Sequence, residues 1–278
     1  MTFERIWRLS GQTIYYAVML FFAAIFIFPF IWMVSGAMKP SSLIFQYPPV
    51  IIPPEPTLQY FFDVFRLAPF GRYMFNSFFV SSTVTIIALL LHAMAGYALA
   101  RLQFPGRDLI FVGILSTLMI PFYTILIPLV LLVKNLGWMD TYWALIVPAI
   151  PHAFGIFWMR QYFLGLPGEL QEAARIDGAS YVNIFFRIGL PLARPILSAL
   201  AVFFFLANWD SFLWPLIVTS SPEMKVVQVG VAGFSGEHGS TWNAILAAST
   251  VAIIPTLTLY FVLQRFIVRS IKMTGLKG

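Results

Sequence analysis

The sequence lacks cysteine entirely and carries few charged residues. Of its 278 residues, 60% are hydrophobic and only 10% are charged, whereas soluble domains are usually about 25% charged. The absence of cysteine excludes disulfides, zinc–thiolate sites and a thiol nucleophile, and it leaves the redox compartment unread. The composition is instead that of a polytopic membrane protein.

Nucleotide and metal motifs are also missing. The sequence has no GxxxxGK[ST] phosphate loop, so we do not expect this chain to bind ATP by that route. Its three histidines, His92, His152 and His238, lack metal-ligand spacing. No paired acids or nucleophile triad suggest a membrane enzyme. We therefore expect no catalytic residues, no metal and no cofactor held by this chain.

Long apolar runs dominate the chain. A transmembrane helix needs about 20 apolar residues, and runs without acidic or basic residues occur at 9–38, 74–100, 109–133, 141–159 and 239–264. A sixth run, 195–219, is apolar except for Asp210. The prediction is an all-α polytopic membrane protein with six transmembrane helices. The first run is too long for a signal-peptide core, and no convincing cleavage site follows, so we expect it to remain as the first span.

Lysine and arginine are unevenly distributed between these runs. Cytoplasmic segments of membrane proteins carry an excess of both, and most of the 17 fall in the two termini and in the second and fourth connecting segments. This bias predicts that both termini are cytoplasmic, and it explains the net charge of +6 better than nucleic-acid binding does. The proline-rich stretch 39–73 then lies outside, as a connector or a docking site for a partner.

The predicted cytoplasmic loop at about 165–192 is too long for a tight turn and carries a small amphipathic helix. Glu172 lies near the positive N-terminal end of that helix, which favours an acid. The two alanines that follow it leave one face thin, so another surface can approach closely. Gly178 permits the left-handed conformation that stops a helix, and Ser180 can cap a second helix over 181–188.

A fixed spacing of residues marks this loop. Glu172-Ala173-Ala174 is followed after three residues by Gly178, and after nine more by Ile188-x-Leu190-Pro191. This pattern resembles the EAA loop of bacterial ABC importer permeases. The segments 208–216 and 264–278 resemble the carbohydrate-uptake branch of that family, and the chain is similar to the six-span subunit of its maltose-type pair. The resemblance covers nearly the whole chain and is most specific over 70–278.

The resemblance implies one transmembrane permease domain over 1–278, with a core at about 70–270, in the bacterial plasma (inner) membrane. The implied partners are a second homologous permease, two ATP-binding subunits that hold ATP and Mg²⁺, an extracytoplasmic solute-binding protein and membrane lipid, but no nucleic acid. The EAA helix of such permeases sits in a cleft of the ATPase; without a partner, it would be a simple re-entrant helix. The implied coupling residues are Glu172, Ala173, Ala174, Arg175, Asp177, Gly178, Ile188, Leu190 and Pro191.

Polar and aromatic residues in the fifth run are candidates for a solute path. Asp210 is the one acid inside a predicted span, and ionisable groups in a membrane are costly and often functional. Together with Asn208, Trp209 and Trp214 it would suit a carbohydrate, which aromatic rings and polar groups commonly hold. The competing interpretation is that Asp210 is wet, near the outer end of a tilted span, or that it caps a kink.

Two further features carry expectations. Phe234, Ser235, Gly236 and Glu237 belong to a predicted outer loop that is either a plain turn or a contact for the binding protein, as the matching loop is in the maltose system. Met119, Pro121 and Pro128 suggest a bent third span.

The predicted function is that of the transmembrane subunit of an ATP-driven importer that moves a carbohydrate into the cytoplasm. One alternative is a permease for another solute, such as a glycerophosphodiester or an anionic oligosaccharide, although no cationic cluster lies inside the spans. The other alternative is a secondary transporter. It would predict an inverted repeat and ion-binding acids at the midplane, and the sequence shows neither.

Overall fold

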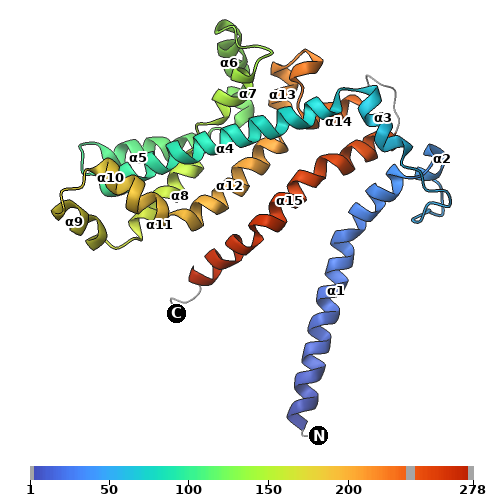
Figure 1. Cartoon of the computed structure of the whole chain (residues 1–278), viewed down its shortest axis with the longest axis horizontal. Helices are drawn as coiled ribbons and strands as arrows, with labels where there is room; N and C mark the ends of the chain where they lie inside the picture. Colours follow the sequence, from blue (N-terminus) through green and yellow to red (C-terminus); the bar gives the residue numbers. More distant parts are fainter. Residues whose placement is uncertain (1–2, 236–241, 275–278) are drawn as a thin grey trace. The chain divides into compact units, whose positions relative to one another are not determined.

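The computed structural model describes residues 3–235 and 242–274, with side chains over 12–235 and 242–262. The described residues form helices without a strand, which confirms the predicted all-α fold (Figure 1). In chain order the elements are α1 (Phe3–Ala37), α2 (Ser41–Ile44), α3 (Gln59–Leu67), α4 (Phe70–Arg101), α5 (Arg107–Ser116), η1 (Thr117–Met119), α6 (Phe122–Asn135), α7 (Tyr142–Ile146), η2 (Val147–Ala149), α8 (Ala153–Leu164), α9 (Glu169–Ile176), α10 (Tyr181–Ile184), η3 (Phe185–Gly189), α11 (Leu190–Leu192), α12 (Arg194–Trp209), α13 (Leu213–Val218), η4 (Pro222–Met224), α14 (Val227–Gly233) and α15 (Trp242–Thr274).

Three of these helices are long and apolar enough to cross a membrane alone. They are α4, the part of α1 from Gln12 to Ala37, and the part of α15 from Trp242 to Val262. These match the first, second and sixth predicted spans. Three further pairs reach the necessary length only together, because each is bent: α5–η1 with α6 by 100°, α7–η2 with α8 by 42°, and α10–α11 with α12 by 76°. The part of the chain that the structure describes thus holds three to six spans, and the count of six and the orientation of the termini stay predictions.

Breaks interrupt the predicted third and fifth spans. The third is bent as predicted, because η1 ends at Met119 and α6 begins only after Pro121. The fifth, predicted as one helix over 195–219, is two helices, because α12 ends at Trp209 and α13 begins at Leu213. Pro215 follows this break closely. It lies in the first turn of α13, where a missing N–H costs little.

The chain divides into two compact units, Met1–Phe70 with Gly230–Ile254 and Gly71–Val229 with Pro255–Gly278. In the first unit, the proline-rich stretch packs against helix ends. Lys39 is fully buried, donates from Nζ to the Val50 carbonyl at 2.5 Å and lies 4.4 Å from the centre of the Trp32 ring. Burial lowers the pKa of its ammonium group. Asn243 of α15 donates to the Lys39 carbonyl, so this stretch is an ordered part of the unit.

The second unit is built around α4. In its first half, Val80 and Val84 share a core cluster with residues of α6, α7, α13 and α14. Near its end, Ala93 and Tyr97 share another with residues of α8, η3 and α12. The two clusters give α4 a different set of neighbours at each end. Figure 1 shows α9 beyond one end of α4 and α13 toward the other.

Candidate functional site

The predicted amphipathic helix is present as α9 and has defined ends. It begins at Glu169, where the Gly168 carbonyl accepts from the amides of Gln171 at 2.9 Å and Glu172 at 3.1 Å. It ends at Ile176, and Gly178, two residues later, has a φ of +80°. Two backbone bonds close that end. The Gly178 amide donates to the Arg175 carbonyl at 3.0 Å, and the Ala179 amide donates to the Ala174 carbonyl at 2.9 Å. This pair of bonds with a left-handed glycine is the Schellman motif, so the predicted glycine stop is confirmed.

A second helix follows immediately, as the sequence predicts. Ser180 caps it by accepting from the Asn183 amide at 3.3 Å. The helix starts at Tyr181 and runs through the π-helical turn η3 into α11, so it is longer than the predicted 181–188. A π-turn inserts one extra residue into the helix. At its end, a Cβ atom added at Gly189 would lie 3.5 Å from the Tyr97 ring of α4.

The residues of the EAA pattern divide between two faces of α9. Ala174 is half-buried and packs on the cluster around Tyr97. Glu172, Ala173 and Asp177 are exposed. The two alanines therefore do not form one thin outer face, because one of them holds the helix to its own chain. Ala173 alone remains for close approach by another surface.

The other residues of the pattern have supporting positions. The Arg175 guanidinium lies 4.7 Å from the centre of the Tyr181 ring and donates to its hydroxyl, which links α9 to the next helix. Ile188 and Leu190 are half-buried against the same core cluster, and Pro191 is exposed. The second half of the motif thus forms the base on which α9 rests.

Ile176 is an exposed apolar residue that the sequence reasoning missed. Its side chain is 87% exposed at the end of α9, and Leu170 in the first turn is 45% exposed. Large apolar side chains in such positions indicate an interaction surface when they gather in a patch. The sequence does carry a signal, since Ile176 is an isoleucine in a short, otherwise polar helix whose inner face Ala174 already fills.

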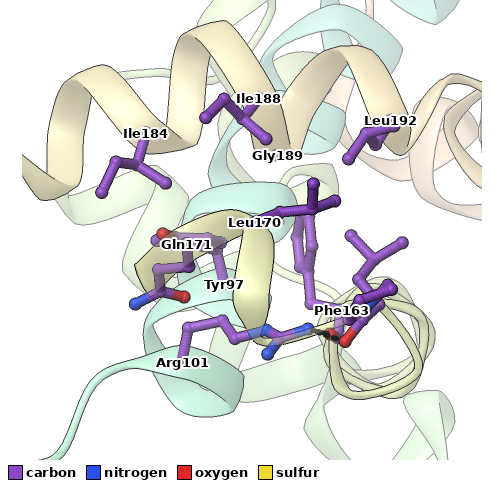
Figure 2. Close-up of a pocket in the computed structure, with 11 residues that line it drawn as sticks. Tyr97, Arg101, Phe163, Leu170, Gln171, Ile184, Ile188, Gly189 and Leu192 are labelled. Atoms are coloured by element: carbon purple, nitrogen blue, oxygen red, sulfur yellow. Dashed lines mark hydrogen bonds between the residues drawn. The ribbon is translucent and has the colours of Figure 1, made fainter. Parts of the chain in front are cut away.

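Beneath α9 lies a hollow of about 20 Å³, enough for about one water molecule (Figure 2). Its walls come from α9, from the end of α4 and from η3. Arg101 and Gln171 contribute polar groups to it. The Tyr97 hydroxyl on its wall is buried and has no hydrogen-bond partner among the described residues.

The four residues of the predicted solute path do not converge. Asn208 donates to the Phe204 carbonyl at 2.7 Å, and Trp209 is 1% exposed. Asp210 is exposed and accepts from Gln228 at 3.4 Å. Trp214 differs from the other three: its ring faces a hollow, while its Nε1 donates to the Ala144 carbonyl at 2.9 Å.

This second hollow is open and has a volume of about 350 Å³. It lies where three breaks in the helices meet: the start of α6 after Pro121, η2 before α8, and the interruption between α12 and α13. The lining is aromatic or aliphatic apart from hydroxyl groups, and it contains no charged side chain among the described residues. The residues are Phe122, Tyr123, Leu129, Pro148, Ala149, Ser211, Phe212, Leu213 and Trp214.

The predicted contact loop for the binding protein is described only in part. Phe234 is fully buried, with its ring centre 6.1 Å from that of Phe70, whereas Ser235 is exposed. Gly236 and Glu237 lie outside the described residues. Among the described residues of this predicted contact loop, Ser235 has an exposed side chain and Phe234 does not.

Comparisons with known proteins agree with the architecture. The chain is 37% identical over 261 residues to the arabinooligosaccharides transport system permease protein AraQ of Halalkalibacterium halodurans, covering 93% of this chain and 94% of that protein. It is 33% identical over 270 residues to the sn-glycerol-3-phosphate transport system permease protein UgpE of Yersinia enterocolitica, covering 94% and 96%.

A solved structure shares the fold. It is the crystal structure of a bacterial ABC transporter involved in the import of the acidic polysaccharide alginate, with a TM-score of 0.82, 22% identity, and coverage of 95% of this chain and 99% of that chain. The family described as "Binding-protein-dependent transport system inner membrane component" matches residues 92–273. The chain therefore belongs to the family of inner-membrane components of binding-protein-dependent transport systems.

Proposed function

We propose that this chain is the transmembrane subunit of an ATP-driven importer that carries a carbohydrate into the cytoplasm. It acts as one permease domain with both termini cytoplasmic. Its partners are a second permease, two ATP-binding subunits that hold ATP and Mg²⁺, and an extracytoplasmic solute-binding protein. The observation that carries the proposal is α9, a short helix with a fixed stop, which packs on its own chain by one face and leaves the other free.

The free face of α9 supplies the contact with the ATPase. Ile176 gives it apolar area, Ala173 allows close approach, and Glu172 offers a charge for pairing. Exposed ion pairs contribute only about 0–1 kcal/mol, so docking rests mainly on shape and apolar contact. The stop at Gly178 keeps α9 short, so that it moves as a rigid body.

The open hollow beside Trp214 is the better candidate for solute contact than the fifth run as a whole. Tyr123 and Trp214 offer ring faces, and Ser211 offers a hydroxyl. Phosphate and carboxylate groups are usually held by arginine or lysine. A lining without such residues favours a neutral sugar. The similarity to a glycerol-3-phosphate permease supports a glycerophosphate-type solute as the second candidate.

The coupling proposal is tested in the complete transporter reconstituted in liposomes with its binding protein. Glu172→Lys and Gly178→Asp are expected to allow ATP hydrolysis but to abolish solute uptake, because the first changes the docking face and the second strains a left-handed position. Glu55→Lys reverses an exposed acid in the first unit and serves as the control. Normal uptake by both α9 variants, or a purified wild-type chain that brings down no ATPase, would refute the proposal.

The solute class is tested on the cognate binding protein. Neutral oligosaccharides are expected to raise its melting temperature, because a bound ligand stabilises the folded state. A rise with glycerophosphodiesters, and none with sugars, would select the second candidate.

A further inference from the structure

Two arginines, one from α4 and one from α8, each bond to the backbone of the other helix or of the link that follows it. Arg101, the last residue of α4, donates from Nη2 to the Phe163 carbonyl at 2.5 Å and to the Leu166 carbonyl. In return, Arg160 of α8 donates from Nε to the Leu99 carbonyl of α4 at 3.2 Å. The last carbonyls of a helix carry partial negative charge and lack helical donors. Each arginine thus ties its own helix to the backbone of the other.

The two helices also touch backbone to backbone beside these bonds. A Cβ atom added at Gly96 of α4 would lie 2.6 Å from Met159 Cβ and 2.8 Å from the Arg160 nitrogen. Such an approach is possible only where glycine replaces a larger residue. The end of α4 and the end of α8 therefore form one closely fitted pair.

Arg101 also reaches the start of the coupling helix. Its Nη1 atom lies 3.9 Å from the position that a Cβ on Gly168 would take, and Gly168 is the N-cap of α9. Figure 2 shows the Arg101 side chain running from the end of α4 toward Phe163, near Leu170 and Gln171 of α9. Within the described residues no acidic side chain pairs with it. Its hydrogen bonds go to the backbone at the point where α8 passes into the loop.

The link between α8 and α9 would be weak without this contact. The link consists of four residues, 165–168, and two of them, Gly165 and Gly168, are glycines. Glycine gives the backbone more conformational freedom than other residues do. A force on α9 could therefore bend this link instead of moving α8. The guanidinium bridges two carbonyls, and it fastens the Leu166 carbonyl inside the link to α4.

We propose that Arg101 is a positioning residue that joins the coupling loop to α4, so that a displacement of α9 moves α4 and α8 together. This proposal rests on the proposed role of α9 as the coupling helix. It adds that the movement enters the membrane through the end of α4 as well as through the chain link to α8. Arginine suits the task because its planar fork can bond to two acceptors at once, whereas lysine is a single point of charge.

The test measures movement directly and needs no identified solute. Because the chain has no cysteine, Met94→Cys on α4 and Glu169→Cys on α9 provide the only labelling sites in this chain, and the transporter is assembled with cysteine-free partner subunits. In the otherwise wild-type chain, the distance between the labels is expected to stay the same when MgATP and vanadate are added. In Arg101→Gln, the same addition is expected to shift or broaden that distance, because α9 then moves without α4.

A second readout is the stimulation of ATP hydrolysis by the binding protein. We expect it to fall about fivefold or more in Arg101→Gln, the lower range of typical coupling between two sites. Arg101→Lys is expected to be intermediate, and Arg107→Gln, which removes an arginine bonded to the Leu102 carbonyl and Asp108, is expected to match wild type. A general loss of stability would not produce this order.

The outcomes separate the two proposals. If the wild-type complex shows no stimulation and brings down no ATPase, the coupling role of α9 fails. If the wild type is coupled and Arg101→Gln behaves like it in both readouts, the role of Arg101 alone fails. If Arg101→Gln does not assemble with the ATPase, Arg101→Lys decides the question, and wild-type distances and stimulation in that variant overturn the proposal.

Discussion

The close contact at Gly96 gives a stability prediction that follows directly from geometry. In Gly96→Ala, the new methyl group would meet Met159 Cβ at 2.6 Å and the Arg160 nitrogen at 2.8 Å. These are backbone or first side-chain atoms, so no rotamer change can move them aside. Carbon atoms normally meet at about 3.5–4.0 Å, and the two helices must therefore separate by about 1 Å.

The cost has two parts and one small offset. A gap of about 1 Å removes a quarter to a half of the dispersion energy of the atoms that face it. It also stretches the bond from Arg160 Nε to the Leu99 carbonyl from 3.2 Å to about 4 Å, beyond hydrogen-bond range. Overpacking of this kind costs about 1–3 kcal/mol, and the better helix propensity of alanine returns up to about 1 kcal/mol. We expect a net loss of about 2 kcal/mol.

Thermal unfolding of the purified chain in detergent measures this loss. About 2 kcal/mol corresponds to a melting temperature roughly 4–8 °C lower for a chain of this size. Gly71→Ala is the matched control, because Gly71 lies in the first turn of the same helix and a Cβ there meets nothing within 4 Å. We expect the control to melt at or slightly above the wild-type temperature. Equal melting temperatures for both variants would show that α4 and α8 do not approach this closely.

Three further predictions concern the second unit. Gly155→Ala places a methyl group within 2.9 Å of ring atoms of His92 and is expected to cost about 2 kcal/mol; the double variant with His92→Ala should cost less than the sum of the two, which a double-mutant cycle by thermal unfolding would reveal. Asn76→Ala removes two bonds to the carbonyls of loop 219–226, at 2.7 and 2.8 Å, and should speed protease cleavage in that loop; an unchanged cleavage rate would contradict this anchoring role. Burial raises the pKa of Asp140, but hydrogen bonds from the backbone amides of Ser220 and Ser221 have a larger effect and hold that pKa below its usual range. The contribution to stability is thus present above pH about 4 and is lost as pH falls further, so the advantage in melting temperature of wild type over Asp140→Asn should shrink between pH 6 and pH 3, and a difference that is constant with pH would count against it.

Hydrophobicity and local backbone rules were sufficient for part of this structure. The long helices α1, α4 and α15 lie close to the predicted runs, because a span is a property of local composition. The stop at Gly178 and the cap at Ser180 were predicted because both depend on a few neighbouring residues. The bend at Pro121 follows from the same kind of local rule.

Features that depend on distant contacts could not be read in this way. Pro215 signals a break in the fifth run, but the sequence does not show what the residues beyond the break pack against, such as the Ala144 carbonyl that accepts from Trp214, seventy residues away. The division of Ala173 and Ala174 between two faces depends on where the cluster around Tyr97 lies. The bonds of Arg101 to carbonyls more than sixty residues later leave no periodic trace. Lysine and arginine near the ends of apolar runs were interpreted through topology alone, whereas the structure gives several of them, including Lys39, Arg101 and Arg160, specific partners.

The position of α4 gives a physical reason why one helix should matter to both candidate sites. With 32 residues and a rise of about 1.5 Å per residue, it is roughly 48 Å long. Its end contacts the coupling loop through Arg101, and Val80 and Val84 in its first half share a cluster with Trp214 beside the open hollow. A helix resists compression and bending more than a loop does, because its backbone bonds run along its length. If α9 moves α4 as a rigid body, the same movement reaches the packing of Trp214 without any change along the chain between them. Loosening either contact, at Arg101 or at Val84, should then weaken transport more than it weakens the fold.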